Sequence, residues 1–344
     1  MHTDPTLVLP QTSAHSPLWQ REWQNSFRNL EGLLEFLVLD PQQAPHPLHP
    51  NPSFPIRVPR SFALRMHKGD WNDPLLRQVL PLHSETEERA GFTSDAVGDG
   101  NAQDGPGVLR KYQGRALLLL SGACAVHCRY CFRREYPYED LPAAKADWDR
   151  TYLELEADPT LEEILFSGGD PLSLSDSNLR WHWEHALAIP QVKRIRIHTR
   201  LPVVLPSRID SGFLKLVEEM AARKPFFMVL HINHANEINA ELKDHLQALR
   251  SAGAVLLNQS VLLRGVNDTA DALVALSEQL LDCSILPYYL HQLDRVRGAW
   301  HFEVPEKEGL ILMDELRQRL PGYGVPKYVR EIAGEGSKVE IAAQ

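Results

Sequence analysis

Short apolar runs alternate with longer amphipathic segments through the second half of the chain. The runs are rich in leucine, β-branched and aromatic residues, have the length of buried strands, and lie at 116–122, 162–169, 192–199, 226–233, 255–263 and 285–293. Between them, apolar positions recur every three or four residues, as on one face of a helix, at 145–158, 175–188, 210–223, 236–253 and 270–282. This order predicts a parallel α/β sheet with right-handed crossovers, either doubly wound or curled into a full or partial barrel.

The first hundred residues follow a different pattern. Seven prolines within 41–59 predict an extended connection, a short helix is expected over 73–81, and the acidic, glycine-punctuated residues 84–107 indicate a loop. We expect this part to cap the sheet as helices and loops. Its longest helix is predicted over 19–37, from the three- and four-residue spacing of Trp19, Trp23, Phe27, Leu30, Leu34 and Leu37.

Charge and hydropathy narrow the range of partners. With 36 Lys and Arg against 45 Asp and Glu in 344 residues, the net charge is −9, which argues against nucleic acid or an anionic membrane as a partner. The N-terminal residues show no basic stretch leading into an apolar one, and no run of about 18 apolar residues occurs. We expect a cytoplasmic protein that acts on a small molecule or another protein.

Cysteine spacing gives the first chemical signal. Cys124, Cys128 and Cys131 form a C-x3-C-x2-C motif directly after the first predicted strand, whereas Cys283 stands alone beside an apolar run and is expected in the core. Clustered thiols without an export signal favour metal or cluster ligation over disulfides. Three thiolates on a four-iron cluster leave one iron open. A zinc site, which would need a fourth Cys or His in a matching pair, remains one alternative; His127 lies in the loop, but no second C-x2-C or H-x3-H follows. Buried thiols without any ligand are the other alternative.

Polar residues close nearly every predicted strand. They lie at 167–170, 198–200, 231–233 and 291–294, each directly after or at the end of an apolar run. The carboxyl ends of parallel strands meet at one rim of a barrel, where active sites of such folds are built. The sequence therefore predicts chemistry at that rim.

The cysteine motif, followed one βα unit later by SGGDPL at 167–172, resembles the radical S-adenosylmethionine (SAM) superfamily. Within it, the chain is similar to the lysine 2,3-aminomutases from Val58 to Lys338, with CRYCFRR, HTRLPVVLP, HINHANEI, NQSVLLRGVND, PYYLHQLD and GEGSK in the family's order. The resemblance implies a partial (β/α)6 TIM-like barrel over 108–300. It implies an N-terminal helical extension over 1–107, and a C-terminal helix with a segment that binds pyridoxal 5′-phosphate (PLP) over 301–344.

The same resemblance implies roles for individual residues. Arg133 would bind the α-carboxylate of L-lysine, and Asp294 and Glu331 would bind its ε-ammonium. Position 331 is glutamate here, where better-studied lysine enzymes of the family carry aspartate. The implied cofactor residues are Cys124, Cys128 and Cys131 for a [4Fe-4S] cluster; Gly168, Gly169, Asp170 and Gln259 for SAM; and Lys338 as Schiff base, Arg115 at the phosphate and Tyr112 near the ring for PLP.

The implied activity is that of an isomerase that converts L-lysine to β-lysine by radical chemistry and needs an electron donor for its cluster. The short chain resembles the subgroup whose β-lysine modifies translation elongation factor P through a downstream ligase. Two alternatives remain open from the sequence. One is a PLP-independent radical SAM enzyme in which Lys338 is a tail residue. The other is a non-catalytic iron–sulfur or zinc protein that binds a partner.

Overall fold

The computed structural model describes residues 16–142 and 144–342. The expected absence of an export signal concerns mainly residues 1–15, which lie outside this range. The strands are β1 (Val108–Leu109), β2 (Arg115–Ser121), β3 (Glu163–Gly168), β4 (Arg194–Thr199), β5 (Phe226–His231), β6 (Val255–Val261), β7 (Leu286–His291), β8 (Lys327–Arg330) and β9 (Val339–Glu340). The helices are α1 (Leu18–Gln24), α2 (Leu30–Phe36), α3 (Arg60–Ala63), α4 (Pro74–Arg77), α5 (Lys145–Glu156), α6 (Asp176–Ala188), α7 (Leu201–Val204), α8 (Ser211–Ala221), α9 (Ala240–Ser251), α10 (Ala270–Asp282) and α11 (Glu306–Arg319).

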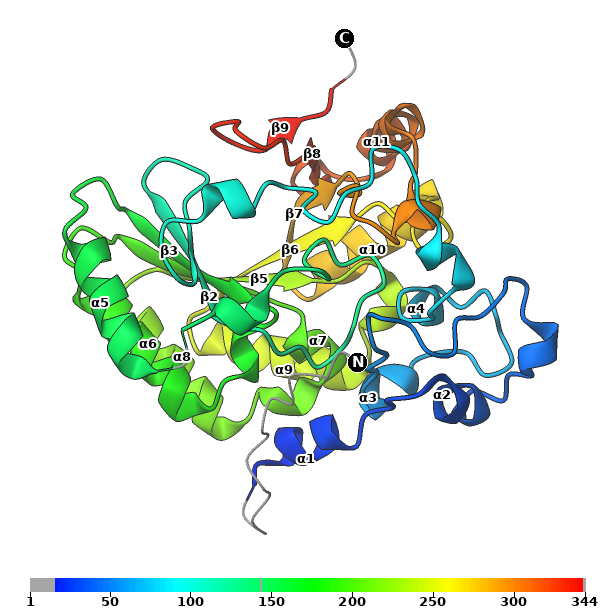
Figure 1. The fold of residues 1–344 in the computed structure, drawn as a ribbon, viewed down its shortest axis with the longest axis horizontal. Coiled ribbons are helices and arrows are strands. Elements are labelled where there is room, and N and C mark those ends of the chain that lie inside the picture. Colours follow the sequence, from blue (N-terminus) through cyan, green and yellow to red (C-terminus); the bar gives the residue numbers. More distant parts are fainter. Residues whose placement is uncertain (1–15, 143, 343–344) are drawn as a thin grey trace.

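Across the described residues, the strands form one nine-stranded sheet in sequence order from β1 to β9. Strands β2 to β8 pair in parallel, and β1 and β9 add antiparallel edges. Because the strand order never reverses, the sheet winds in one direction as in a barrel, and the doubly wound alternative is excluded. The six predicted strands are β2 to β7, and the predicted partial barrel is confirmed. Figure 1 shows the curved sheet with α5, α6, α8 and α9 on its outer side.

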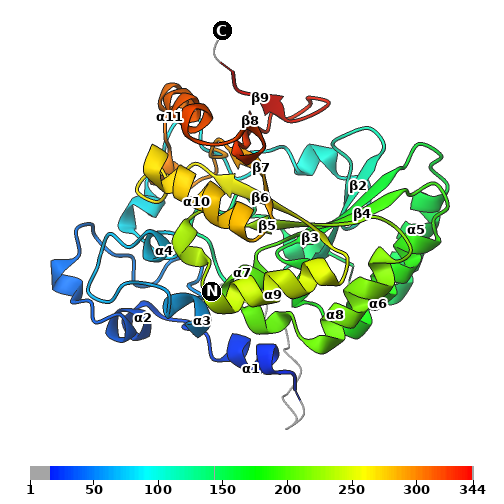
Figure 2. The ribbon, with the colours of Figure 1, turned by 180° about the vertical axis from the view of Figure 1, so that it is seen from behind.

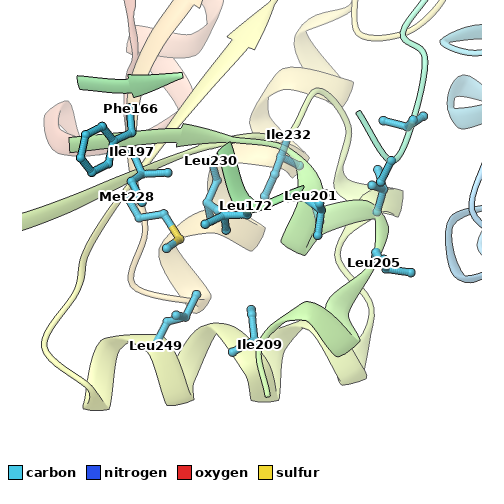
Figure 3. Close-up of a cluster of buried hydrophobic side chains, with 14 of the residues drawn as sticks. Phe166, Leu172, Ile197, Leu201, Leu205, Ile209, Met228, Leu230, Ile232 and Leu249 are labelled. Atoms are coloured by element: carbon cyan, nitrogen blue, oxygen red, sulfur yellow. The ribbon is translucent and has the colours of Figure 1, made fainter. Parts of the chain in front are cut away.

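The outer face of the sheet forms the core because alternate strand residues point toward the helices. Phe166, Ile197 and Met228 are fully buried on neighbouring strands. Figure 3 shows these side chains extending from the sheet toward Leu249 of α9, which is also fully buried. The helices predicted from periodicity therefore cover the outside of the barrel, with α9 and α10 in front of the sheet in Figure 2. This packing leaves the opposite, inner face free for polar residues.

The predicted single helix over 19–37 is wrong. The structure has two short helices, α1 and α2, because the backbone of Phe27 is not helical and pairs with Val58. The Phe27 N lies 2.8 Å from the Val58 O, and the Val58 N lies 3.0 Å from the Phe27 O. Asn29 then caps α2, its side chain accepting from the Gly32 N–H at 2.8 Å. The apolar spacing was real, since the aromatic and leucine residues are buried, but it continues across a break in the helix.

The N-terminal extension lies beside the barrel, and α11, β8 and β9 lie at its far edge (Figure 1). Among the described residues, no helix combines the length and the apolar composition needed to cross a membrane.

Candidate functional site

The cysteine loop leaves the carboxyl end of β2. Cys124, Cys128 and Cys131 are uncross-linked and partly buried, and the Arg200 Nη1 donates to the Cys128 Sγ at 2.9 Å. Burial, followed by the charges of the neighbouring thiols, raises the pKa of Cys124 well above its usual value, and burial raises that of Cys131 to about 11. Three unlinked thiols on one loop, with an N–H donor beside the Cys128 sulfur, suit ligation of three irons of a four-iron cluster. In the described residues, no group of three or more His, Cys, Asp or Glu is arranged to hold a single metal ion.

Residues of the N-terminal extension also contact the cysteine loop and stabilise it. Arg57 Nη1 donates to the Cys124 carbonyl at 3.1 Å, and the His127 N–H donates to the Arg57 carbonyl at 3.0 Å. Arg129, which is fully buried, pairs with Glu85, and Arg134 Nη2 reaches the same carboxylate at 2.8 Å. The loop is thus fixed by residues 57–85 as well as by the barrel.

The two glycines of the SGGD element allow β3 to end directly against the cysteine loop. A Cβ atom on Gly168, whose φ is +135°, would collide with the Ser121 carbonyl oxygen, and one on Gly169 would lie 2.7 Å from the Gly122 oxygen. The Gly169 N–H instead donates to Ser121 O at 2.7 Å, and the Asp170 N–H donates to Ala123 O at 2.8 Å. Only glycine permits this close approach of two backbones.

Asp170 is a buried residue whose carboxylate links two neighbouring loops by hydrogen bonds. Its carboxylate accepts from Thr199 Oγ1 at 2.7 Å and from the N–H groups of Arg200, Leu201 and Leu172 at 2.8 to 3.0 Å. Burial raises the pKa of Asp170, and these donors oppose the shift. Its side chain therefore ties the loop after β3 to the start of α7, while its predicted contact with SAM stays a prediction.

Three histidines on the strands line the inner face of the barrel. His198 is the last residue but one of β4, His231 ends β5 and His291 ends β7, so they share the predicted rim. Burial lowers the pKa of each well below its usual value, so the rings are neutral. The charges of Lys338 and Arg133 both add to the effect of burial on His198. Residues far apart in the sequence therefore meet around one polar interior.

Arg133 lies on the cysteine side of this interior. It is 8% exposed, and its Nε donates to Asp99 Oδ2 at 2.6 Å while its Nη1 donates to Ser167 Oγ at 3.3 Å. Burial disfavours the charged guanidinium, but Asp99 raises the pKa of Arg133 above its usual value. Asp99 comes from the segment that the sequence indicated only as a loop.

Lys338 lies in the connection between β8 and β9. Its Nζ donates to Glu331 Oε2 at 2.6 Å, and Tyr112 OH donates to the same carboxylate at 2.7 Å. The Lys338 side chain is only 22% exposed, so it is not a solvated tail residue. Burial works against ionisation of Glu331, yet Lys338, Tyr112 and Lys111 hold its pKa below the usual value.

Asp294 belongs to the same group of charges. Burial raises its pKa to about 7, with the negative charge of Glu331 adding to the shift and the positive charge of Lys338 opposing it. Asp294 and Glu331, the two carboxylates that the resemblance assigned to an ammonium ligand, therefore lie close enough for the charge of one to affect the pKa of the other. A cation placed between them would favour ionisation of both.

The two remaining predicted cofactor residues are Arg115 and Gln259. Arg115 is 45% exposed on its side chain, 3.7 Å from Glu163, with its guanidinium 5.5 Å from the Tyr112 ring centre. Gln259 sits on β6 in register with His231 and Tyr289, on the inner face. Their roles in binding PLP phosphate and SAM stay predictions.

Sequence reasoning missed Asp99, Lys111 and Arg200 as parts of the site. Arg200 directly follows β4 and could have been weighed individually, because it belongs to the polar cluster 198–200 that the sequence places at the rim. Asp99 and Lys111 carry no such signal, since each becomes informative only when the fold joins them through an ion pair of 2.8 Å.

Relatives named L-lysine 2,3-aminomutase match over most of the chain, although no protein-family model matches it. The one from Escherichia coli (strain K12) is 47% identical over 85% of this chain and 84% of its own length. The one from Haemophilus influenzae is 42% identical over 97% and 99%, and the one from Clostridium subterminale 31% over 94% and 77%. A solved radical SAM methyltransferase from Sphaerobacter thermophilus aligns with a TM-score of 0.43 at 18% identity, over 64% of this chain and 68% of its own. That likeness is too distant to bear on function.

These relatives define the class of protein, which is an isomerase of the aminomutase type. With identities of 31 to 47% over most of both chains, it belongs to the L-lysine 2,3-aminomutase family.

Proposed function

We propose that this protein converts L-lysine to β-lysine with a [4Fe-4S] cluster, SAM and PLP. The observation that carries the proposal is the arrangement of the inner face. Arg133, two residues after the last thiol of the loop, is joined through Asp99 and Lys111 to Glu331, and Glu331 pairs with Lys338 and acts on Asp294. The names of the relatives support lysine as the substrate.

The binding groups match the two ends of a lysine molecule. Arg133 can bind a carboxylate by donating charge-assisted N–H hydrogen bonds, and the carboxylates of Glu331 and Asp294 can accept hydrogen bonds from an ammonium. A second carboxylate helps because removing an ammonium from water is costly, and one partner seldom offsets that cost. The site therefore selects a zwitterion with a cationic end rather than an acidic amino acid.

The three thiols would hold the cluster, the Gly168–Gly169 backbone would receive SAM, and Lys338 would hold PLP. When bound, the cluster and SAM supply a carbon radical that removes hydrogen from the substrate, and PLP carries the migrating nitrogen. The chain's own contribution is orientation and exclusion of water. Neutral His198, His231 and His291 suit that interior, because they line it without adding charge.

The test is anaerobic conversion of labelled L-lysine after reconstitution with iron, sulfide, SAM, PLP and a reductant. We expect β-lysine by mass spectrometry, with chiral analysis giving its configuration. Cys124→Ala should abolish SAM cleavage, Lys338→Ala should abolish the absorbance of bound PLP, and Cys283→Ala, a buried thiol outside the loop, should retain activity. Absence of β-lysine in protein verified to contain iron and PLP would contradict the proposal.

We further propose that the β-lysine serves modification of translation elongation factor P through a ligase, which the resemblance of this short chain to that subgroup supports. The electron donor for the cluster is a second proposed partner. Mass spectrometry of elongation factor P from cells with and without this gene tests the first point. An unchanged mass in cells lacking the gene would contradict it.

A further inference from the structure

The Arg133 guanidinium uses only some of its N–H donors in hydrogen bonds to the described residues. Arginine has five N–H donors, and the bonds to Asp99 Oδ2 and Ser167 Oγ use one on Nε and one on Nη1. The guanidinium carbon also lies 4.8 Å from the ring centre of Phe132. Of these contacts, only the one with Asp99 combines charge with a short distance, so Asp99 dominates the orientation of the group.

Asp99 is itself a fixed anion. It is 2% exposed, and its N–H donates to Asp95 Oδ1 at 2.9 Å while the next N–H, of Gly100, donates to Asp95 Oδ2 at 2.9 Å. Burial works against ionisation, but Arg133 and Lys111 hold the pKa of Asp99 below its usual value. The carboxylate is therefore charged at neutral pH, and its backbone is anchored.

The second cation on Asp99 leads to the other end of the site. Lys111 Nζ lies 2.8 Å from Asp99 Oδ1 and 3.6 Å from Glu331 Oε1. Arg133, Asp99, Lys111 and Glu331 thus form a row of alternating charges. The row joins the group proposed for the substrate carboxylate to the group proposed for its ammonium.

We propose that Asp99 is a positioning residue for substrate recognition, which orients Arg133 so that its remaining N–H donors bind the carboxylate of the amino acid. The inference rests on the proposed function, in which Arg133 binds that carboxylate. Without the Asp99 charge, the contacts left to the guanidinium among the described residues are the 3.3 Å bond to Ser167 and the approach to the Phe132 ring. Recognition of the carboxylate then weakens, while contacts with the rest of the substrate persist.

The test compares two amines on the PLP-loaded protein without SAM, so that no turnover occurs. L-Lysine and cadaverine, which is lysine without its carboxylate, are titrated while the absorbance of bound PLP is followed. In Asp99→Asn we expect the affinity for L-lysine to fall about tenfold or more and that for cadaverine to change less than about threefold, as loss of one charge-assisted contact predicts. Asp104→Asn, an exposed acid of the same segment, is the matched control and should match the wild type.

Arg133→Ala separates failure of this inference from failure of the proposed function. If Arg133→Ala removes the preference for L-lysine and Asp99→Asn keeps it, Asp99 does not position Arg133. If Arg133→Ala itself keeps the preference, the proposed carboxylate site is wrong. Should Asp99→Asn fail to fold, Asp99→Glu retains the charge but displaces the guanidinium, and it should lose part of the preference. An unchanged preference in Asp99→Glu would overturn the inference.

Discussion

The ion pair between Lys338 and Glu331 places an ammonium group where the proposed substrate would place its own. Lys338 Nζ lies 2.6 Å from Glu331 Oε2, and its charge also acts on Asp294. The longer side chain of glutamate at 331 can receive the Tyr112 hydroxyl and the Lys338 ammonium together. In the proposed function Lys338 would hold PLP, so this pair would open and the Glu331 carboxylate would be left for a substrate ammonium.

Asp294 gives the substrate-free protein a defined pH dependence. Its pKa is raised to about 7 by burial, with Glu331 adding to the shift and Lys338 and Lys111 opposing it, while Asp99 also raises it. The folded state therefore binds a proton that the unfolded state releases near pH 4, so stability falls as pH rises from about 4 to about 7. The slope from one such group is at most about 1.4 kcal/mol per pH unit.

We expect Asp294→Asn to remove this part of the slope. Thermal unfolding of cofactor-free protein between pH 5 and pH 8 measures it, as the difference between the variant and the wild type. The variant should be less destabilised by rising pH, since it has no carboxyl to ionise. Parallel pH profiles for the two proteins would show that Asp294 is not protonated in the folded state.

At the scale of elements, the close contact between the ends of β2 and β3 sets the position of the cysteine loop. Gly168 has a φ of +135°, and its missing Cβ would collide with Ser121. We expect Gly168→Ala to lower the free energy of unfolding by roughly 2 kcal/mol or more, through backbone strain and the collision. SAM affinity should fall as well, because the two loops separate.

Gly322→Ala is the matched control, since a Cβ there meets nothing within 4 Å and the backbone is not left-handed. Urea unfolding of both variants and SAM binding by calorimetry provide the measurements. Equal stability and equal SAM affinity in the two variants would show that the close approach of β3 to β2 does not position the site.

Elements with a strong period could be predicted, and those set by distant contacts could not. Strands β2 to β7 follow from long apolar runs, but β8 spans only Lys327–Arg330 and starts and ends with a charged residue. It becomes a strand by pairing with β7. The break at Phe27 was likewise hidden, because its backbone pairs with Val58 across 31 positions of sequence while its ring keeps the apolar spacing. For the site, motifs located the thiols and Lys338, whereas Asp99 needed the fold.

At the scale of the whole molecule, the N-terminal extension and the C-terminal strands both hold parts of the candidate site. The connection between β8 and β9 carries Lys338. The N-terminal extension supports the cysteine loop through Arg57, Glu85 and the Phe54 carbonyl, which accepts from Arg129 Nη1 at 2.8 Å. The extension, which the sequence predicted only as a cap of helices and loops, therefore has a structural role beside the thiols.

Glu85 is the residue on which this support depends most. Its side chain is 3% exposed and receives both Arg129, which is fully buried, and Arg134, which is 6% exposed. Glu85→Gln would leave two buried cations without their anion, and removing one partner from a buried pair costs about 3–5 kcal/mol. We expect the variant to unfold at a lower urea concentration and, because Arg129 adjoins Cys128, to retain less iron per chain after anaerobic reconstitution.

The control is Glu184→Gln, which breaks an ion pair with Arg223 in which both side chains are about half exposed. It should change the free energy of unfolding by less than about 1 kcal/mol and retain full iron loading. If Glu85→Gln matched Glu184→Gln in both measurements, the extension would not be what holds the cysteine loop in place.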